Sequence, residues 1–234
     1  MAASQLDEIL LAGREHLDPA YVAGYDGKAG FDPAADVAVL RSRGLGPTST
    51  LIDFGAGTGT LAVAAARYCR RVIAVDVSPA MVDEIRAKAS RAEATNVVAV
   101  QAGFLGYAHD GDPVDAIYSR NALHHLPDLW KAIALCRMAD LLAAGGTLRL
   151  RDLVFSFAAA DAARGIERWI DQTPSQSSAV GWTRAELEAH LRDEHSTFTW
   201  LLEPMLLQAG FEVVQRGYAP IGAYADYTCV KIGG

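Results

Sequence analysis

The sequence has few cysteines, and their spacing predicts neither a disulfide nor a zinc site. Cys69, Cys136 and Cys229 are scattered, odd in number and form no CxxC pair. Such thiols are typical of a reducing compartment. The first residues also lack the basic region and apolar stretch of a signal peptide. These absences together favour a cytoplasmic protein.

Long apolar runs and an excess of positive charge are missing as well. No run of about 18 apolar residues occurs, so the sequence predicts no membrane-spanning helix. With 21 Lys and Arg against 28 Asp and Glu, the formal net charge is −7. This charge disfavours general binding to nucleic acids, because such binding depends on cations that neutralise phosphates. We therefore expect no nucleic-acid or membrane partner. No spacing of His, Asp and Glu predicts a metal site.

The length and evenness of the chain predict a single domain. Its 234 residues are enough to bury a large core, and no repeat or low-complexity tract divides them. We expect one domain over 1–234, with an N-terminal helical segment at 1–45 and an inserted helical cover at about 156–196. A first helix capped by Ser4 precedes a glycine- and tyrosine-bearing stretch, Tyr21–Phe31. Asp32-Pro33 then opens a helix that runs to about Gly44.

From residue 50, short apolar runs alternate with helical patterns. The expected strands are Thr50–Phe54, Val72–Val75, Val97–Val100, Val114–Ser119 and Thr147–Val154. The expected helices between them are Leu61–Cys69, one opened by Ser78-Pro79, and one capped by Asp128 and ended by Gly145-Gly146. This rhythm predicts a parallel sheet with helices on both faces.

The alternation stops near residue 155. Ala158–Ile170 has a helical pattern, Gln172–Ser178 is a polar loop, and Thr183 to Glu186 form a capping box. After a helix at Phe198–Gln208, the strands Phe211–Tyr218 and Tyr224–Lys231 flank a short loop, which predicts an antiparallel pair. The expected fold is a doubly wound, mostly parallel seven-stranded α/β sheet with an antiparallel last strand and a helical cover.

A glycine-rich turn is the sharpest motif. Residues 53–59 read Asp-Phe-Gly-Ala-Gly-Thr-Gly, between an expected strand and an expected helix. Alternate glycines let the backbone approach a ligand, and the following helix presents free N–H groups. Because any strand-to-helix turn can use glycine, the motif alone is weak evidence. The next strand ends in Asp76, where an acid can accept hydrogen bonds from both hydroxyls of an adenosine ribose.

Four motifs in this order resemble the class I, Rossmann-like methyltransferases that use S-adenosylmethionine (SAM), of the small-molecule type. They are the glycine turn, Val-Asp-Val-Ser-Pro-Ala-Met at 75–81, Asn-Ala-Leu-His-His-Leu-Pro-Asp at 121–128, and Gly-Gly-Thr-Leu at 145–148. The resemblance covers about residues 21–155. It implies that SAM is the cofactor and that a methyl group passes by SN2 transfer to an O, N or C atom of a small molecule. An NAD-binding turn would more typically read G-x-G-x-x-G.

The resemblance also implies roles for single residues. The backbone at Gly55, Ala56, Gly57 and Gly59 would lie against the methionine part of SAM, with Asp53 ordering the loop and the ammonium group. Backbone carbonyls near Ser119 and Arg120 would receive that ammonium.

At the other end of the cofactor, Asp76 would bind the ribose diol, and Val77 and Met81 would flank adenine. For Met81, plain core packing is an equal alternative. Many relatives carry an acid after the third strand that accepts a hydrogen bond from the adenine amino group. Here Gly103 takes that position. The backbone at Phe104, or water, would have to substitute for the acid.

A segment before the domain resembles one that folds over the SAM pocket in some relatives. It reads Tyr-Asp-Gly-Lys-Ala-Gly-Phe-Asp-Pro from Tyr25. The hydroxyl of Tyr25 could stand near the methyl group, which makes Tyr25 a catalytic candidate, and Lys28 could meet the carboxylate of methionine. Alternatively, Tyr21 and Tyr25 only pack the segment down.

His124 is the other catalytic candidate, since imidazole is a suitable general base for an acceptor that loses a proton. It and His125 could equally be one packed and one solvated residue. In the cover, Asp193, Glu194 and His195 could aim one side chain at the pocket or could form a solvated face.

Aromatic residues in and around the cover favour an acceptor with apolar surface, unless they simply form core. They are Phe155, Phe157, Trp169, Trp182 and Phe198. Two other functions fit the same motifs. One is a non-catalytic regulatory module that binds SAM or a nucleotide, and the other is an NAD(P)-dependent reductase.

Overall fold

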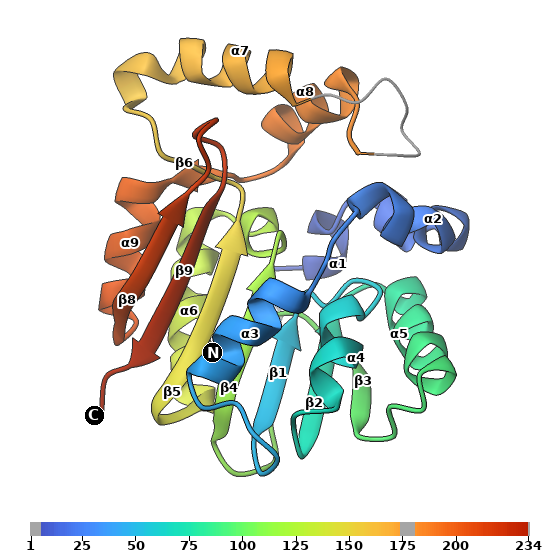
Figure 1. Cartoon of the computed structure of the whole chain (residues 1–234). Coiled ribbons are helices and arrows are strands. Elements are labelled where there is room, and N and C mark those ends of the chain that lie inside the picture. Colours follow the sequence, from blue (N-terminus) through green and yellow to red (C-terminus); the bar gives the residue numbers. More distant parts are fainter. Residues whose placement is uncertain (1–5, 174–180, 234) are drawn as a thin grey trace.

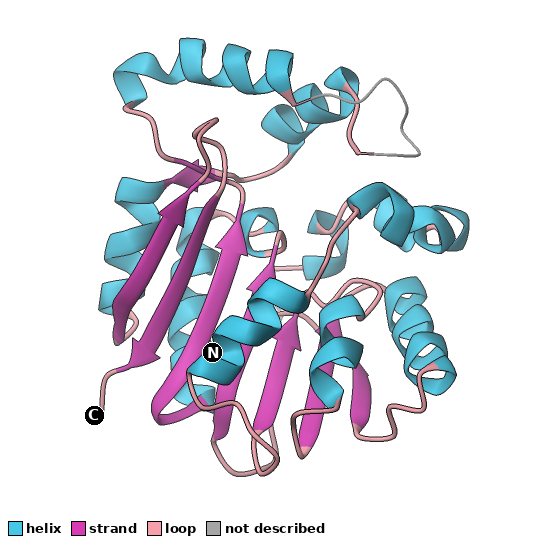
Figure 2. Cartoon of the chain, viewed as in Figure 1, coloured by secondary structure: helices cyan, strands magenta, loops and turns pink. Residues whose placement is uncertain are grey.

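A seven-stranded sheet forms the centre of the molecule (Figures 1 and 2). The computed structural model describes residues 6–173 and 181–233. The strand order is β3-β2-β1-β4-β5-β9-β8. The strands are β1 (Thr50–Phe54), β2 (Arg71–Asp76), β3 (Val97–Gln101), β4 (Val114–Arg120), β5 (Leu142–Asp152), β8 (Phe211–Tyr218) and β9 (Ala225–Lys231).

The direction of the strands agrees with the expected fold. Strands β1 to β5 pair in parallel, whereas β9 is antiparallel to both β5 and β8. A doubly wound sheet with one reversed last strand is therefore confirmed. In such a sheet, ligands bind outside the carboxyl ends of the strands, at the point where the strand order reverses. Here β1 and β4 are neighbours at that point.

Helices cover both faces of the sheet. Figure 1 shows α3 and α4 over one face and α6 and α9 over the other. The helices of these layers are α3 (Ala34–Ser42), α4 (Thr60–Ala66), α5 (Pro79–Arg91), α6 (Asp128–Leu141) and α9 (Thr199–Gln208). Each layer encloses its own buried cluster, one containing Leu40 and Leu61 and the other Leu135 and Leu206. Among the helices of the described residues, none is long and apolar enough to cross a membrane.

Two further groups of helices lie beyond the carboxyl ends of the central strands (Figure 1). The N-terminal group consists of α1 (Glu8–Leu11), the 3₁₀ helix η2 (Arg14–Leu17) and α2 (Pro19–Ala29). The second group consists of η4 (Ala159–Asp161), α7 (Ala162–Gln172) and α8 (Arg184–Asp193), and we call it the cover. The short parallel strands β6 (Val154–Phe155) and β7 (Thr197–Phe198) lie at the base of the cover.

The aromatic residues of the cover form a core of their own. Phe155 and Trp169 are buried in it, and Phe157, Trp182 and Phe198 pack against it. Four of these rings, all but Trp182, pack against one another, whereas Trp182 also lines a pocket, so Trp182 alone still supports the inference of an apolar acceptor. The capping box is confirmed: the Thr183 hydroxyl accepts from the Glu186 N–H, while the Glu186 carboxylate accepts from the Thr183 N–H.

Several expected boundaries were wrong, among them the fifth strand, which is Leu142–Asp152 and not Thr147–Val154. The helix α6 ends at Leu141, before Gly145-Gly146, because Leu142 already pairs with Val114 as part of β5. Asp128 does not cap α6; it accepts a hydrogen bond from Lys131 Nζ at 2.8 Å instead.

The start of the first helix was also wrong, because Asp7 caps it and not Ser4. Ser4 and most of the expected loop Gln172–Ser178 lie outside the described residues.

Candidate functional site

The glycine turn between β1 and α4 has the backbone that its sequence predicts. Gly55, Gly57 and Gly59 have φ values of 64°, 55° and 79°. These values lie in the left-handed region that side chains disfavour. A Cβ atom at Gly55 would lie 2.2 Å from Cβ of Ala122, so the turn also packs too closely for a side chain. Beneath the turn, burial raises the pKa of Asp53 well above its usual value, and Asp76 adds to this shift.

Asp76 ends β2 directly beside this turn. One of its oxygens accepts a hydrogen bond from the Gly57 N–H at 2.8 Å, and the other accepts from the Ser78 N–H at 2.9 Å. Burial raises the pKa of Asp76, and the two backbone donors oppose this rise. Each carboxylate oxygen can accept a second hydrogen bond. Asp76 is thus fixed in position and still has acceptor capacity toward the pocket that it lines.

A carboxylate from the N-terminal segment occupies the place where Gly103 leaves no acid. Oε1 of Glu8 accepts hydrogen bonds from the N–H groups of Leu105 at 3.0 Å and Gly106 at 3.2 Å. A Cβ atom at Gly103 would lie only 2.3 Å from Oε2 of Glu8. Burial raises the pKa of Glu8, and the backbone donors oppose this rise. The glycine therefore makes room for Glu8 next to the loop after β3.

The end of β4 presents polar atoms that lack partners. Ser119 Oγ, Arg120 Nη1 and Asn121 Oδ1 are buried without a hydrogen-bond partner among the described residues. Arg120 and Asn121 line the pocket. The Arg120 guanidinium stacks over the Phe31 ring at 4.1 Å. Buried polar groups normally have partners, so the unpartnered atoms of Arg120 and Asn121 fit a polar ligand in the pocket.

Tyr25 and Lys28 both lie on α2 but have different surroundings. Tyr25 lines the pocket, and burial raises the pKa of its hydroxyl to about 12. Lys28 is not among the lining residues. Its ammonium group forms an ion pair with Glu186 of the cover at 2.5 Å and lies 5.0 Å from the Tyr21 ring centre.

Histidines and acids lie together on the side of the pocket opposite Asp76. His124 belongs to the 3₁₀ helix η3 (Leu123–His125). Its Nδ1 is hydrogen-bonded to Asp152, and its Nε2 lies 2.9 Å from Oε2 of Glu194. Burial alone would lower the pKa of His124, but the two carboxylates raise it to about 10. For His125, burial and the neighbouring His124 lower the pKa well below its usual value.

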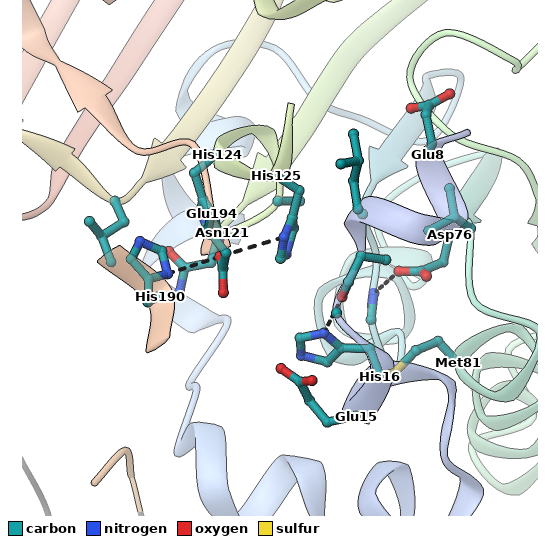
Figure 3. A pocket seen from close by; sticks show the side chains of 18 of the residues that line it. Glu8, Glu15, His16, Asp76, Met81, Asn121, His124, His125, His190 and Glu194 are labelled. Carbon is teal, nitrogen blue, oxygen red and sulfur yellow. Dashed lines mark hydrogen bonds and ion pairs between the residues drawn. The ribbon is translucent and has the colours of Figure 1, made fainter. Parts of the chain in front are cut away.

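One pocket of about 730 Å³ connects these groups. In Figure 3, Asp76, Met81, His16 and Glu8 lie on one side, and His124, His125, His190 and Glu194 on the other. The volume is within the range for small-molecule sites. The pocket is therefore large enough for a cofactor and a second small molecule.

Of the fifteen residues that the sequence assigned to cofactor binding or catalysis, ten line the pocket: Tyr25, Gly55, Gly57, Asp76, Val77, Met81, Gly103, Phe104, Arg120 and His124. Five do not line it: Lys28, Asp53, Ala56, Gly59 and Ser119. For both groups, the assigned roles in cofactor binding or catalysis stay predictions.

The sequence interpretation missed Glu8, His16 and His190. The ring of His16 packs edge-on against Tyr25 at 5.8 Å and His125 at 5.9 Å, so it joins the two sides of the pocket. No local pattern marks these residues, because each reaches the site only through tertiary contacts. The sequence left open whether Asp193, Glu194 and His195 aim a side chain at the pocket or form a solvated face, and Glu194 does point into the pocket.

Comparison with known proteins is consistent with this geometry. A family described as a methyltransferase domain matches residues 51–146. An uncharacterized methyltransferase from Geobacillus kaustophilus is 30% identical over 139 residues, which cover 57% of this chain and 60% of that protein. The chain thus matches less than two thirds of that relative's length.

Two solved structures share the fold. Magnesium protoporphyrin IX methyltransferase from Synechocystis with bound SAM has a TM-score of 0.66 at 16% identity, covering 97% of this chain and 99% of its own. The [4+2]-cyclase SpnF has a TM-score of 0.65 at 16% identity, covering 86% of this chain and 81% of its own. Residues 51–146 thus match a methyltransferase-domain family, and the sheet order and the glycine turn are those of the class I, Rossmann-like methyltransferase fold.

Proposed function

We propose that this protein binds SAM and transfers its methyl group by an in-line SN2 step to an O, N or C atom of a small molecule. The observation that carries the proposal is the junction of the glycine turn with Asp76 inside a pocket that also has room for an acceptor. Catalysis would then rest mainly on alignment of the two partners, which can supply a large part of a barrier reduction.

Individual residues would share the binding of the cofactor. Asp76 would accept hydrogen bonds from the ribose hydroxyls, and Gly57 would let the backbone lie against the methionine part. The unpartnered oxygen of Asn121 would suit the ammonium group. Tyr25, held by α2, would close the site near the methyl group. At 1–45 and 156–196, the N-terminal segment and the cover would form parts of one domain over 1–234.

The alternatives make different predictions about binding. A reductase would bind a nicotinamide cofactor, and a regulatory module would bind SAM without transfer. The similarity to a [4+2]-cyclase shows that this fold does not by itself guarantee methyl transfer. Cofactor choice and turnover therefore need separate measurements.

We expect SAM to raise the melting temperature and NADPH to leave it unchanged. Saturation at about a hundred times Kd stabilises a protein by about 2.7 kcal/mol, which for a chain of this size is a shift of roughly 5–10 °C. Differential scanning fluorimetry measures the shift. Turnover is then assayed as formation of S-adenosylhomocysteine with a panel of small acceptors. A shift with NADPH and none with SAM would contradict the proposal.

We further infer that Glu8 supplies the acceptor for the adenine amino group that position 103 lacks. Glu8→Gln is the sharpest test, because it keeps the size of the side chain. The glutamine amide has two orientations, and both are unfavourable. If its oxygen accepts from the N–H groups of Leu105 and Gly106, its NH₂ group faces the adenine amino group, which is also a donor. If the amide is turned over, the two backbone N–H groups lose their acceptor. We expect roughly tenfold weaker SAM binding by calorimetry.

Moving the carboxylate from position 8 to position 103 gives the control. Gly103→Asp alone should not improve binding, since its Cβ would displace the Glu8 carboxylate. In a Glu8→Ala background, Gly103→Asp should restore part of the lost affinity. Full affinity in the Glu8→Gln variant would remove Glu8 from the adenine site.

A further inference from the structure

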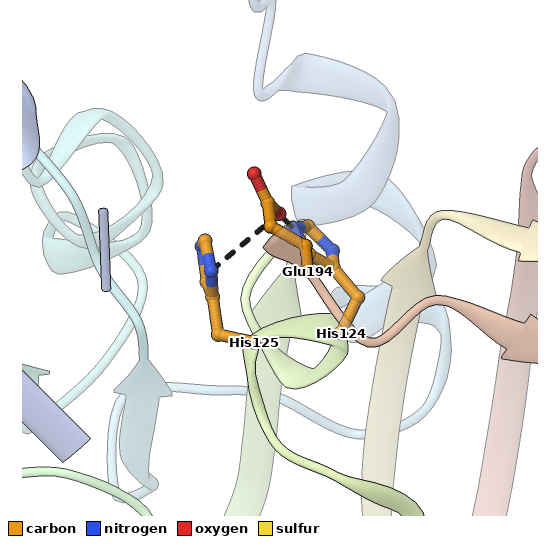
Figure 4. Close-up of side chains that lie close together, drawn as sticks. All are labelled: His124, His125 and Glu194. Atoms are coloured by element: carbon orange, nitrogen blue, oxygen red, sulfur yellow. Dashed lines mark ion pairs between the residues drawn. The ribbon is translucent and has the colours of Figure 1, made fainter. Parts of the chain in front are cut away.

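Three histidines surround one carboxylate oxygen at the acceptor side of the pocket (Figure 4 shows His124, His125 and Glu194). Oε2 of Glu194 lies 2.9 Å from His124 Nε2, 3.5 Å from His125 Nδ1 and 2.9 Å from His190 Nδ1. His125 Nδ1 and Glu194 Oε2 are nevertheless buried without a hydrogen-bond partner among the described residues. The contacts from His124 and His190 are ion-pair distances, but no well-directed hydrogen bond from the described chain satisfies these two atoms, which suits atoms that face a common point.

We propose that His124, His125 and Glu194 bind a divalent transition-metal cation such as Zn²⁺. One donor atom from each residue lies within 4.8 Å of the other two. Around a tetrahedral Zn²⁺, with metal–ligand bonds of about 2.1 Å, neighbouring donor atoms are about 3.4 Å apart. The observed separations from Glu194, 2.9 and 3.5 Å, bracket this value. Two imidazoles and one carboxylate are also a common ligand set for Zn²⁺ and Fe²⁺.

The residues behind the donor atoms hold them in place. Asp152 is 2% exposed and binds His124 twice, at the backbone N–H and at Nδ1, which leaves Nε2 directed at the metal position. His190 Nε2 contacts Ser196 Oγ at 2.7 Å, while its Nδ1 faces Glu194. A carboxylate on the far nitrogen of a ligating histidine is the usual support in metal sites.

The charges around the cluster also favour a cation. Among the described residues, the carboxylates of Asp152 and Glu194 form ion pairs only with histidines and none with Lys or Arg. Lys131, the nearby ammonium group, is bound to Asp128 and to the carbonyl of His195. Asp152 is buried and Glu194 is half-buried, and a protonated His124 offsets only one of these two carboxylates; a divalent cation in place of that proton offsets both.

The role of the metal rests on the proposed function, although metal binding itself does not. His124, His125 and Glu194 line the pocket, so the remaining coordination position faces the acceptor. An acceptor with a hydroxyl or thiol group would bind there and lose its proton to solvent, because a bound metal lowers the pKa of such groups. The S–CH₃ bond of SAM then breaks as the bond from methyl to acceptor forms, and S-adenosylhomocysteine leaves. His124 acts in this scheme as a ligand and not as a general base.

The test uses untagged, chelator-treated full-length protein and Zn²⁺ alone, in competition with a chromophoric chelator. We expect one equivalent of Zn²⁺ per chain, and at least tenfold weaker binding in both His125→Asn and Glu194→Gln. His109→Asn, which alters a histidine in the loop after β3, is the matched control and should bind as the unmodified protein does. Co²⁺ in place of Zn²⁺ should give the d–d absorption bands of a tetrahedral site, and Glu194→Gln should abolish them.

Two outcomes would overturn the site: no stoichiometric Zn²⁺ binding, or binding that survives both ligand substitutions. A melting curve of each variant without metal identifies any that fails to fold, in which case the Co²⁺ spectrum of the other variant decides. SAM affinity is measured on the same samples. Metal binding without SAM binding would refute the proposed function and leave the metal site standing, whereas the reverse result would refute only the metal site.

Discussion

Asp76→Ala should weaken SAM binding by about 2 kcal/mol, which is roughly a thirtyfold rise in Kd. The carboxylate is placed by two backbone N–H groups, those of Gly57 and Ser78. It therefore reaches the ribose hydroxyls without having to be ordered when the cofactor binds. Removing it takes away the charged acceptor and leaves the Gly57 N–H of the glycine turn unpaired. Isothermal titration calorimetry measures the loss.

A second acid provides the control for net charge. Asp83→Ala, on α5, removes a side chain that is 75% exposed and, within the described part of the chain, pairs only with Arg86, so SAM affinity should be unchanged. Asp76→Asn keeps the size of the side chain and guards against a variant that does not fold. Equal affinity in Asp76→Ala and the unmodified protein, with normal melting, would place the ribose elsewhere.

Gly55→Ala should lower the free energy of unfolding by about 3 kcal/mol and the melting temperature by roughly 6–12 °C. Two separate costs contribute. A left-handed backbone, with φ of 64°, costs about 1–2 kcal/mol for any residue with a Cβ. The new Cβ would also lie 2.2 Å from Cβ of Ala122, which starts the segment leading to His124.

Gly30→Ala separates these two costs. Gly30 has a similar φ of 53°, but nothing lies within 4 Å of the Cβ that it would gain. Chemical denaturation should therefore show a loss of about 1 kcal/mol for Gly30→Ala and clearly more for Gly55→Ala. If the two variants lose the same stability, the close approach of Gly55 to Ala122 has no energetic consequence.

Most of the sheet could be predicted because its strands are continuous apolar runs with clear ends. Thr50–Phe54 and Phe211–Tyr218 have the bounds that the sequence predicts. Prediction failed where tertiary pairing overrides local preference. Leu142 follows a helical pattern, but it is drawn into β5 by its pairing with Val114 and is 1% exposed.

The residues of the candidate site also divide into those that a local motif indicates and those that only tertiary packing brings to the site. Gly57 and Asp76 belong to local motifs at a strand end, so the sequence could indicate them. Glu8 meets the loop after β3 across almost a hundred positions of the chain, and Glu194 meets His124 from the cover. Such contacts depend on how α1 and α8 pack, and no spacing within either helix records them.

The ion pair between Lys28 and Glu186 has a consequence for the exchange of bound molecules. It ties α2 to α8, and the Gly181 N–H donates to the Lys28 carbonyl beside it. The Lys28 side chain is only 5% exposed. If the cover lifted alone, the Lys28 ammonium group would lose its carboxylate partner and would have to be solvated by water instead. The cover and the N-terminal segment must therefore move together, or water must reach Lys28 first, before the contents of the pocket can leave.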